Sequence, residues 1–183
     1  MAGKIVIALV VVAATFIIVV ATRPAEFHIE RSIIVGTPPS VAFAQVNDLH
    51  AWAAWSPWEK LDPKMEKTFS GPSTGPGSSY AWKSESGKVG QGRMTIEKSE
   101  PPARVIVKLE FIKPFAATNT VTFTFDDTSE GTKVTWAMDG HNSFMGKAFS
   151  LLMNMDKMVG GDFERGLTSL KALAEAKSPP PPA

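Results

Sequence analysis

The side chains that could do chemistry are few in this 183-residue sequence, and they are far apart. The three histidines are His28, His50 and His141, and none stands in an H-x-x-x-H or H-E-x-x-H spacing, so the pattern predicts no zinc site. Cysteine is absent, which excludes disulfides, thiolate metal sites and a cysteine nucleophile. The letters of a hydrolase elbow, G-x-S-x-G, occur once, at 71–75, but this stretch leads into a strand and not into a helix, as the elbow requires. The motifs of a phosphate-binding loop and a dinucleotide-binding turn are missing. We therefore predict no metal, no cofactor and no motif-defined catalytic residue.

The charge balance argues against nucleic acid as a partner. The chain has 19 basic and 18 acidic side chains, and Lys4 is the only charged residue among the first 22, so the remainder carries no net charge. Binding to nucleic acid needs a clustered positive field. Lys and Glu are instead scattered, as on an ordinary solvated surface.

The most apolar part of the chain is an uncharged run of seventeen residues, IVIALVVVAATFIIVVA, at positions 5–21. A helix of this length covers about 25 Å, close to the roughly 30 Å hydrocarbon core of a bilayer. We predict that residues 1–25 hold a single-pass membrane anchor, with residues 5–21 in the membrane. The alternative is a signal peptide cleaved after Ala21, although Lys4 is its only basic residue and Val19-Val20-Ala21 is a poor cleavage pattern.

The orientation in the membrane is less well marked. Lys4 and the terminal amine stand on one side, and Arg23 and Arg31 on the other, so the basic residues nearly balance. Because N-terminal segments of this kind usually export the domain behind them, we expect the C-terminal domain outside the cytoplasm.

Residues 26–177 have the pattern of one domain. Residues 27–35 alternate as a strand, and Pro38-Pro39 begins a short helix that a second short helix follows through Trp52. Six more stretches have strand character: 65–70, 78–83, 90–98, 104–112, 117–126 and 131–139. Residues 143–177 then carry an apolar stripe at a spacing of three or four, which predicts one long helix with Gly160-Gly161 as a candidate kink. Residues 178–183 are a proline-rich tail that cannot continue it.

These elements predict an α+β fold. The turns between the strands are short, so consecutive strands should be antiparallel neighbours in one seven-stranded sheet. One face of that sheet is apolar and needs a cover, and the long C-terminal helix is the only element large enough. A curved sheet wrapped around a helix leaves space between them, where apolar ligands bind.

Several short motifs add a resemblance to this interpretation. The motifs are Asp48, Trp55-Ser56-Pro57-Trp58, Phe69-Ser70-Gly71-Pro72, Gly75-Pro76-Gly77-Ser78, Trp82, Val89-Gly90-Gln91-Gly92-Arg93-Met94, Gly131-Thr132-Lys133-Val134-Thr135-Trp136 and Phe163-Glu164-Arg165-Gly166-Leu167. Together the sequence resembles the polyketide cyclase/dehydrase-like branch of the START/SRPBCC superfamily over residues 27–177. The resemblance implies a helix-grip fold with a deep hydrophobic pocket between sheet and C-terminal helix. It implies no single reaction, because family membership does not fix an activity.

The cavity candidates are aromatic and flexible apolar residues on the faces expected to point inward. They are Trp82, Met94, Phe111, Phe123, Trp136 and Met138 on strands, Met155, Val159 and Phe163 on the helix, and Trp55 and Trp58 near the mouth. Methionine suits adaptable apolar surfaces. Any single one of them is more often plain core, and the Trp55–Trp58 segment could be a plug, a lid or an edge that dips into the membrane.

The sequence supports three functional hypotheses. We favour a non-catalytic, membrane-tethered domain that binds a lipid or another hydrophobic small molecule in the cavity. A cyclase or dehydrase is the alternative, and it requires at least two polar groups inside the cavity, from candidates such as His50, His141, Arg93, Asp139 and Tyr80; Arg93 or Arg31 could also hold a polar head. A membrane-associated accessory protein without a ligand is the third hypothesis, and it requires a solid interior.

Overall fold

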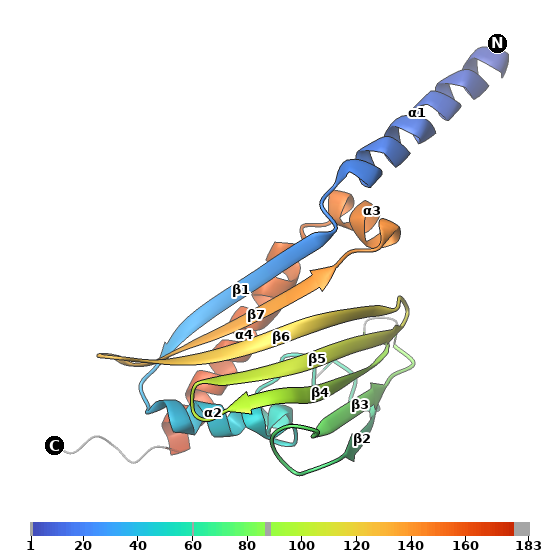
Figure 1. The fold of residues 1–183 in the computed structure, drawn as a ribbon. Coiled ribbons are helices and arrows are strands. Elements are labelled where there is room, and N and C mark those ends of the chain that lie inside the picture. Colours follow the sequence, from blue (N-terminus) through green and yellow to red (C-terminus); the bar gives the residue numbers. More distant parts are fainter. Residues whose placement is uncertain (1, 60, 87–88, 178–183) are drawn as a thin grey trace.

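The computed structural model describes residues 2–59, 61–86 and 89–177. The expected proline-rich tail at 178–183 lies outside the described residues. Helix α1 (Ala2–Thr22) projects away from a single folded domain (Figure 1). An 18-residue window within it has a mean hydropathy of 3.1, and it is the one helix of the described part that is long and apolar enough to cross a membrane. Residues 23–25 alone separate it from the domain.

Seven antiparallel strands form one sheet, which confirms the predicted fold class. The strands are β1 (Glu26–Val35), β2 (Glu66–Ser70), β3 (Ser79–Lys83), β4 (Gln91–Glu100), β5 (Arg104–Lys113), β6 (Ala117–Thr128) and β7 (Gly131–His141). Their order in space is β1-β7-β6-β5-β4-β3-β2, so β1 and β7 are neighbours although they are distant in sequence. Alternation sets the register: Val121 lies opposite Met138 and Phe123 opposite Trp136, and all four side chains are buried on one face.

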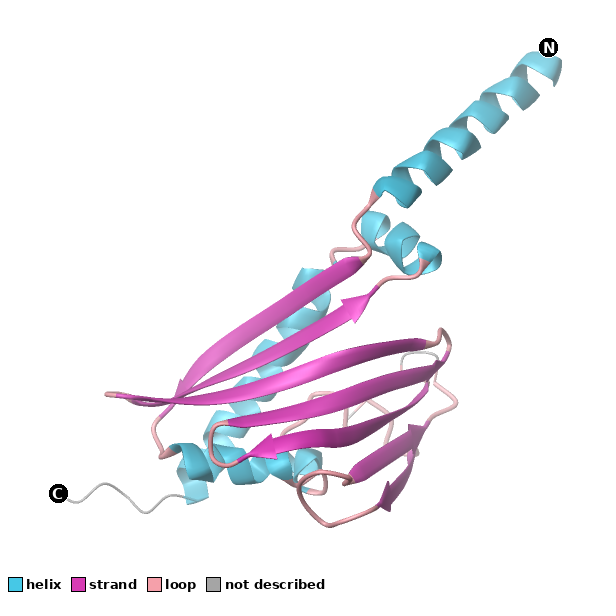
Figure 2. Cartoon of the chain, in the orientation of Figure 1, coloured by secondary structure: helices cyan, strands magenta, loops and turns pink. Residues whose placement is uncertain are grey.

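That face is covered by helices α2 (Pro39–Asn47) and α4 (Met155–Lys177), with the short 3₁₀ turn η1 (Ala51–Ala54) beside α2 (Figure 2). Pro39 occupies the first turn of α2, where its missing N–H costs nothing. The buried stripe of α4 consists of Gly160, Phe163, Gly166, Leu167, Leu170 and Ala174. The long C-terminal helix therefore packs on the sheet as the apolar spacing predicts.

The expected single helix over residues 143–177 is divided, and this prediction is wrong in detail. Helix α3 (Phe144–Leu152) ends at an extended Met153, and α4 begins after Asn154. The side-chain Oδ1 of Asn154 accepts a hydrogen bond from the Lys157 N–H at 2.9 Å, which is the bond of a helix N-cap. The break lies there because Asn154 satisfies a free N–H of the new helix.

Gly160, the expected kink site, lies instead inside continuous α4 helix. A Cβ at this position would lie 2.1 Å from Nη2 of Arg31. The Arg31 guanidinium bonds the carboxylates of Asp156 at 3.0 Å and Glu164 at 2.9 Å, and so fastens β1 to α4. The glycine permits this close approach.

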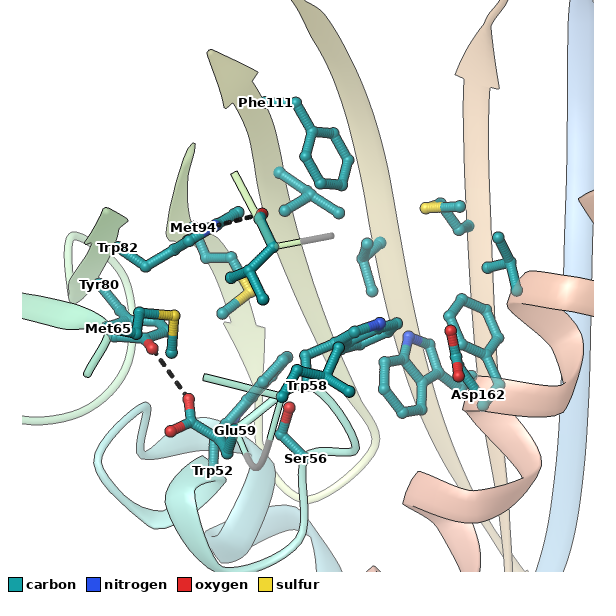
Figure 3. A pocket seen from close by; sticks show the side chains of 18 of the residues that line it. Trp52, Ser56, Trp58, Glu59, Met65, Tyr80, Trp82, Met94, Phe111 and Asp162 are labelled. Atoms are coloured by element: carbon teal, nitrogen blue, oxygen red, sulfur yellow. Dashed lines mark hydrogen bonds between the residues drawn. The ribbon is translucent and has the colours of Figure 1, made fainter. Parts of the chain in front are cut away.

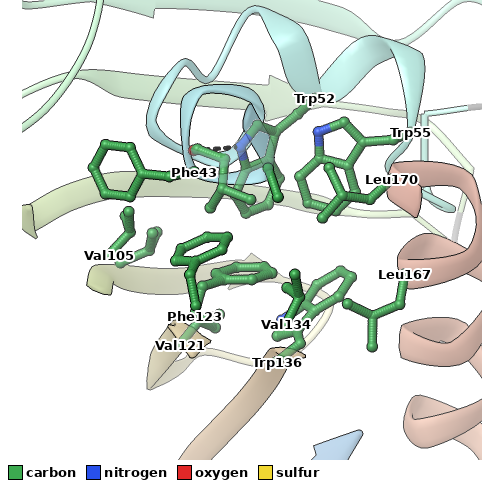
Figure 4. Packing of buried hydrophobic residues seen from close by; sticks show 14 of the residues in the cluster. Phe43, Trp52, Trp55, Val105, Val121, Phe123, Val134, Trp136, Leu167 and Leu170 are labelled. Carbon is green, nitrogen blue, oxygen red and sulfur yellow. Dashed lines mark hydrogen bonds between the residues drawn. The ribbon is translucent and has the colours of Figure 1, made fainter. Parts of the chain in front are cut away.

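The core contains a cluster of aromatic rings (Figure 4). Trp136 is stacked on Phe163 with ring centroids 4.2 Å apart, and it meets Trp52 and Trp55 edge to face. The Trp52 indole N–H donates to the Val46 carbonyl at 2.9 Å. Trp55 and Trp58 both contact the Trp136 ring, so the segment after η1 packs against the sheet.

An ion pair at the β4–β5 turn gives a pH-dependent prediction. Hydrogen bonds from Arg104, and then from Lys98, lower the pKa of Glu100 from its ordinary 4.5 to about 2. Since the folded-state pKa is depressed, the stabilisation is present above about pH 4.5 and is lost as the pH falls towards 2. We expect Arg104→Ala to move the Glu100 pKa upward in a carboxyl-carbon NMR titration. Lys83→Ala, which removes a separate ion pair with Glu66, is the control and should leave it unchanged; an unaltered Glu100 pKa in Arg104→Ala would contradict the assignment.

Candidate functional site

A cavity of about 340 Å³ lies between the concave face of the sheet and α4 (Figure 3). The irregular segment between η1 and β2 forms its third side. Its lining comprises Trp52, Ser56, Trp58, Glu59, Leu61, Met65, Tyr80, Trp82, Val89, Met94, Leu109, Phe111, Val121, Trp136, Met138, Met158, Val159, Asp162 and Phe163. The wall is predominantly apolar and rich in aromatic rings and methionines.

Strand alternation accounts for the sheet side of the wall. Leu109 and Phe111 point inward from β5, and Met94 lies opposite Leu109 on β4. Trp82 of β3 pairs with Gly92 of β4, and a Cβ on Gly92 would lie 2.4 Å from the Trp82 ring. The indole therefore occupies this position against β4 only because residue 92 has no side chain.

One polar cluster interrupts this apolar wall. The Tyr80 hydroxyl donates to Glu59 Oε1 at 2.9 Å, and Glu59 also forms an ion pair with Lys67. The Glu59 side chain is only 8% exposed. Burial, and next the hydrogen bond to Glu59, raise the pKa of Tyr80 above its usual range, so the phenol stays protonated and acts as a donor. The cavity wall therefore contains the Glu59 carboxylate, which Tyr80 and Lys67 fix in position, and the Tyr80 phenol.

We expect the Glu59–Lys67 pair to behave as a coupled unit. Lys67→Met should lower the free energy of unfolding by about 1–3 kcal/mol, because it leaves a nearly buried carboxylate unpaired. The double variant Lys67→Met/Glu59→Gln should recover much of that loss, since the neutral amide still accepts the Tyr80 hydrogen bond. Urea unfolding of the wild-type protein, the two single variants Lys67→Met and Glu59→Gln, and the double variant gives the coupling energy. Additive losses would contradict the coupling.

The structure brings together eight of the eleven predicted cavity residues: Trp58, Trp82, Met94, Phe111, Trp136, Met138, Val159 and Phe163. It places the other three elsewhere. Trp55 and Phe123 are buried in the packed core at 2% and 0% exposure, because α2 and η1 cover that end of the sheet. Met155 is the first residue of α4, before the helix reaches the cavity.

The sequence interpretation missed some lining residues. Leu109 and Val121 share the predicted inward faces of their strands, so the alternation alone could have included them. Glu59 and Leu61 belong to an irregular segment, where no periodic signal exists. Met65 is the first residue of the predicted 65–70 strand and lies one residue before β2 begins. Met158 was missed because it is not part of the predicted apolar stripe: it precedes Val159, a residue of that stripe, and lies at the edge of the helix face.

The candidate catalytic groups do not converge. Of the five polar residues considered, Tyr80 alone lines the cavity. His50 bonds Asp48 and stacks on Phe69. The remaining three lie on exposed positions of the sheet: Arg93, His141 and Asp139, the last of which bonds His28 at 2.7 Å. Arg31, considered for a polar ligand head, is engaged by two carboxylates of α4.

A curved antiparallel sheet gripping a long C-terminal helix, with an apolar cavity between them, defines a helix-grip protein. The chain belongs to the polyketide cyclase / dehydrase and lipid transport family, whose sequence model matches residues 26–175. This confirms the resemblance found in the sequence. No protein of curated function matches the sequence significantly.

Solved structures with the same fold are distant in sequence. The protein CV1439 from Chromobacterium violaceum is 14% identical with a TM-score of 0.59, over 81% of this chain and 96% of its own. The di-domain ARO/CYC protein StfQ of the steffimycin biosynthetic pathway is 13% identical with a TM-score of 0.63, over 84% of this chain and 52% of its own. The protein Ara h 8.0201 is 12% identical with a TM-score of 0.55, over 83% of this chain and 99% of its own. At such identities the similarity establishes the fold, and this chain spans about half of StfQ.

Proposed function

We propose that this protein binds a lipid or another hydrophobic small molecule in the cavity between the sheet and α4, while α1 holds it at a membrane. The observation that carries the proposal is the cavity itself, about 340 Å³ with a wall of aromatic rings, methionines and aliphatic side chains. Small-molecule sites typically measure about 300–1,000 Å³ and are mainly apolar with a few placed polar groups. The accessory-protein hypothesis needs a solid interior, which this cavity does not favour.

The tether supports the same proposal. Ligands of this kind partition into bilayers, so a binding domain fixed at the membrane meets them at high local concentration. Helix α1 lies outside the domain core and is 21 residues long, as an anchor requires. In this proposal the anchor is retained and the domain lies outside the cytoplasm.

Native mass spectrometry of the full chain, released from detergent micelles, tests the binding proposal. We expect an adduct whose mass corresponds to a co-purified apolar molecule, or uptake of a fatty acid added as a probe. A protein that carries no adduct and takes up no added fatty acid would overturn the proposal. Detection of the peptide that holds residues 5–21 on the mature protein separately tests the anchor against a cleaved signal.

A cyclase or dehydrase function has one observation in its favour, the Glu59–Tyr80 pair inside the apolar wall. The structural neighbour StfQ is described as an ARO/CYC protein. Incubation with a polyketide-like substrate, followed by mass analysis, separates the two functions. Conversion that disappears in Tyr80→Phe and Glu59→Gln while uptake persists would favour the enzyme; uptake without conversion favours the carrier.

A further inference from the structure

Helix α3 is apolar on one face, and nothing in the described part of the domain covers that face. Phe144, Met145, Phe149 and Leu152, which we call the α3 face, are 46%, 61%, 47% and 77% exposed. At about 100° per residue they fall within an arc of about 140° around the helix. No residue of α3 is buried. Four large apolar side chains gathered on one exposed helix face indicate a binding surface rather than scattered surface residues.

Helix α3 lies beside the end of α1 (Figure 1). The two helices are in contact, and the Lys147 ammonium donates to the Ala21 carbonyl at 3.4 Å. Val20, in the last turn of α1, is fully buried although the rest of that helix is exposed. The last turn of α1 and the half-buried side of α3, which carries Lys147 and Leu151, thus form one packed junction.

The segments that connect α1 and α3 to the sheet are short, and a hydrogen bond joins them to each other. The Asn142 N–H, just before α3, donates to the Ala25 carbonyl, just before β1, at 2.7 Å. Residues 23–25 are all that separates α1 from β1, so α3 cannot lie far from the point where α1 leaves the bilayer. Arg23 and Lys147 give this junction positive charge, which suits anionic lipid headgroups.

We infer that the α3 face inserts into the membrane interface as a second contact beside the anchor. The inference rests on the proposed membrane role of α1. A short helix with one exposed apolar face can lie in the membrane plane as interfacial helices do, with its apolar side chains at the boundary of headgroups and acyl chains; Lys147 is its one basic residue. Insertion would fix the orientation of the domain, which residues 23–25 alone could leave free to swing.

The orientation matters for the cavity because α3 leads directly into its helical wall. Met158 and Val159, a few residues after α3, line the cavity, and Met158 is 43% exposed. With the α3 face in the interface, this part of the cavity wall lies next to the lipid surface. A hydrophobic ligand then has a short path from bilayer to pocket.

The absence of cysteine makes the test direct. Single cysteines at Leu152→Cys and Met145→Cys, both at exposed positions, are labelled with an environment-sensitive fluorophore in the full chain. The protein is reconstituted into vesicles of equal parts phosphatidylcholine and phosphatidylglycerol that contain lipids with a nitroxide near the carboxyl end of the acyl chain. We expect both labels to lose on the order of half of their fluorescence, as interfacial insertion predicts. Ser129→Cys, at the exposed β6–β7 turn, is the matched control and should be unaffected.

Val12→Cys, in the middle of α1, separates this inference from the proposal on which it rests. Quenching at Val12 by a nitroxide deep in the acyl chain, with Leu152 and Met145 behaving like Ser129, would overturn the inference and leave the anchor standing. No quenching at any position would overturn both. A blue shift at Leu152 and Met145 without lipid quenching would show a second copy or another protein on the α3 face, and would also overturn the inference.

Discussion

Replacement of Trp136 by Ala is expected to lower the free energy of unfolding by about 3–5 kcal/mol, the range for a fully buried large aromatic residue. Trp136 is 1% exposed and contacts rings from four parts of the chain: strand β6, η1, the segment after η1, and α4. Its loss would therefore loosen the sheet, the loop and the helix together. For a domain of this size the melting temperature should fall by on the order of 10 °C.

Two further variants make this prediction specific. Trp136→Phe should cost distinctly less, because a ring still stacks on Phe163 and because the indole N–H that it removes has no hydrogen-bond partner among the described residues. Trp82→Ala, at the half-buried edge of the cavity, should also cost less, since that indole contacts only Tyr80 and Phe111 among the aromatic rings in the described part of the chain. Thermal unfolding followed by near-ultraviolet circular dichroism measures all three. Equal losses at Trp136 and Trp82 would contradict a central role for Trp136.

The sequence supports prediction of the sheet because its strands are amphipathic. Val121, Phe123 and Phe125 alternate with threonines, and this alternation fixes which face is buried. It cannot say which buried residue borders a cavity. Val121 lines the pocket and Phe123, two residues on, is fully packed, because α2 and η1 cover one end of the face and leave the other open. That difference depends on the placement of helices, which no strand pattern contains.

The apolar pattern also could not show the division between α3 and α4, because it continues across the break. The apolar spacing continues from Phe149 through Leu152 to Met155, so periodicity indicates one helix where the structure has two. Asn154 was the available signal, since Asn is a preferred N-cap. Glu59 carried no signal of its own: it became part of the cavity wall because Tyr80 and Lys67, from the neighbouring strands, meet it there.

Filling the cavity from within should abolish ligand uptake without unfolding the protein. Leu109 is half-buried and lines the pocket from β5. In Leu109→Trp the larger indole would occupy space that a ligand needs, and we expect the affinity for an apolar fluorescent probe such as N-phenylnaphthylamine to fall at least about tenfold, or about 1.4 kcal/mol. Because the ring enters an existing cavity rather than a close-packed core, the cost to stability should stay below the roughly 1–3 kcal/mol of overpacking.

Lys108→Trp is the matched control for this variant. Lys108 is the preceding residue of β5, and its side chain pairs with Glu110 on the opposite face of the sheet, so it adds the same indole outside the cavity. Energy transfer from the protein's tryptophans to the probe reports binding, and both variants raise the number of donors equally. Transfer that saturates normally in Lys108→Trp and is lost in Leu109→Trp would place the probe between sheet and helix. Leu109→Trp leaves the outer surface intact, so it can remove binding only by occupying the space that the ligand uses. Equal transfer in the two variants would therefore mean that the probe binds outside the cavity.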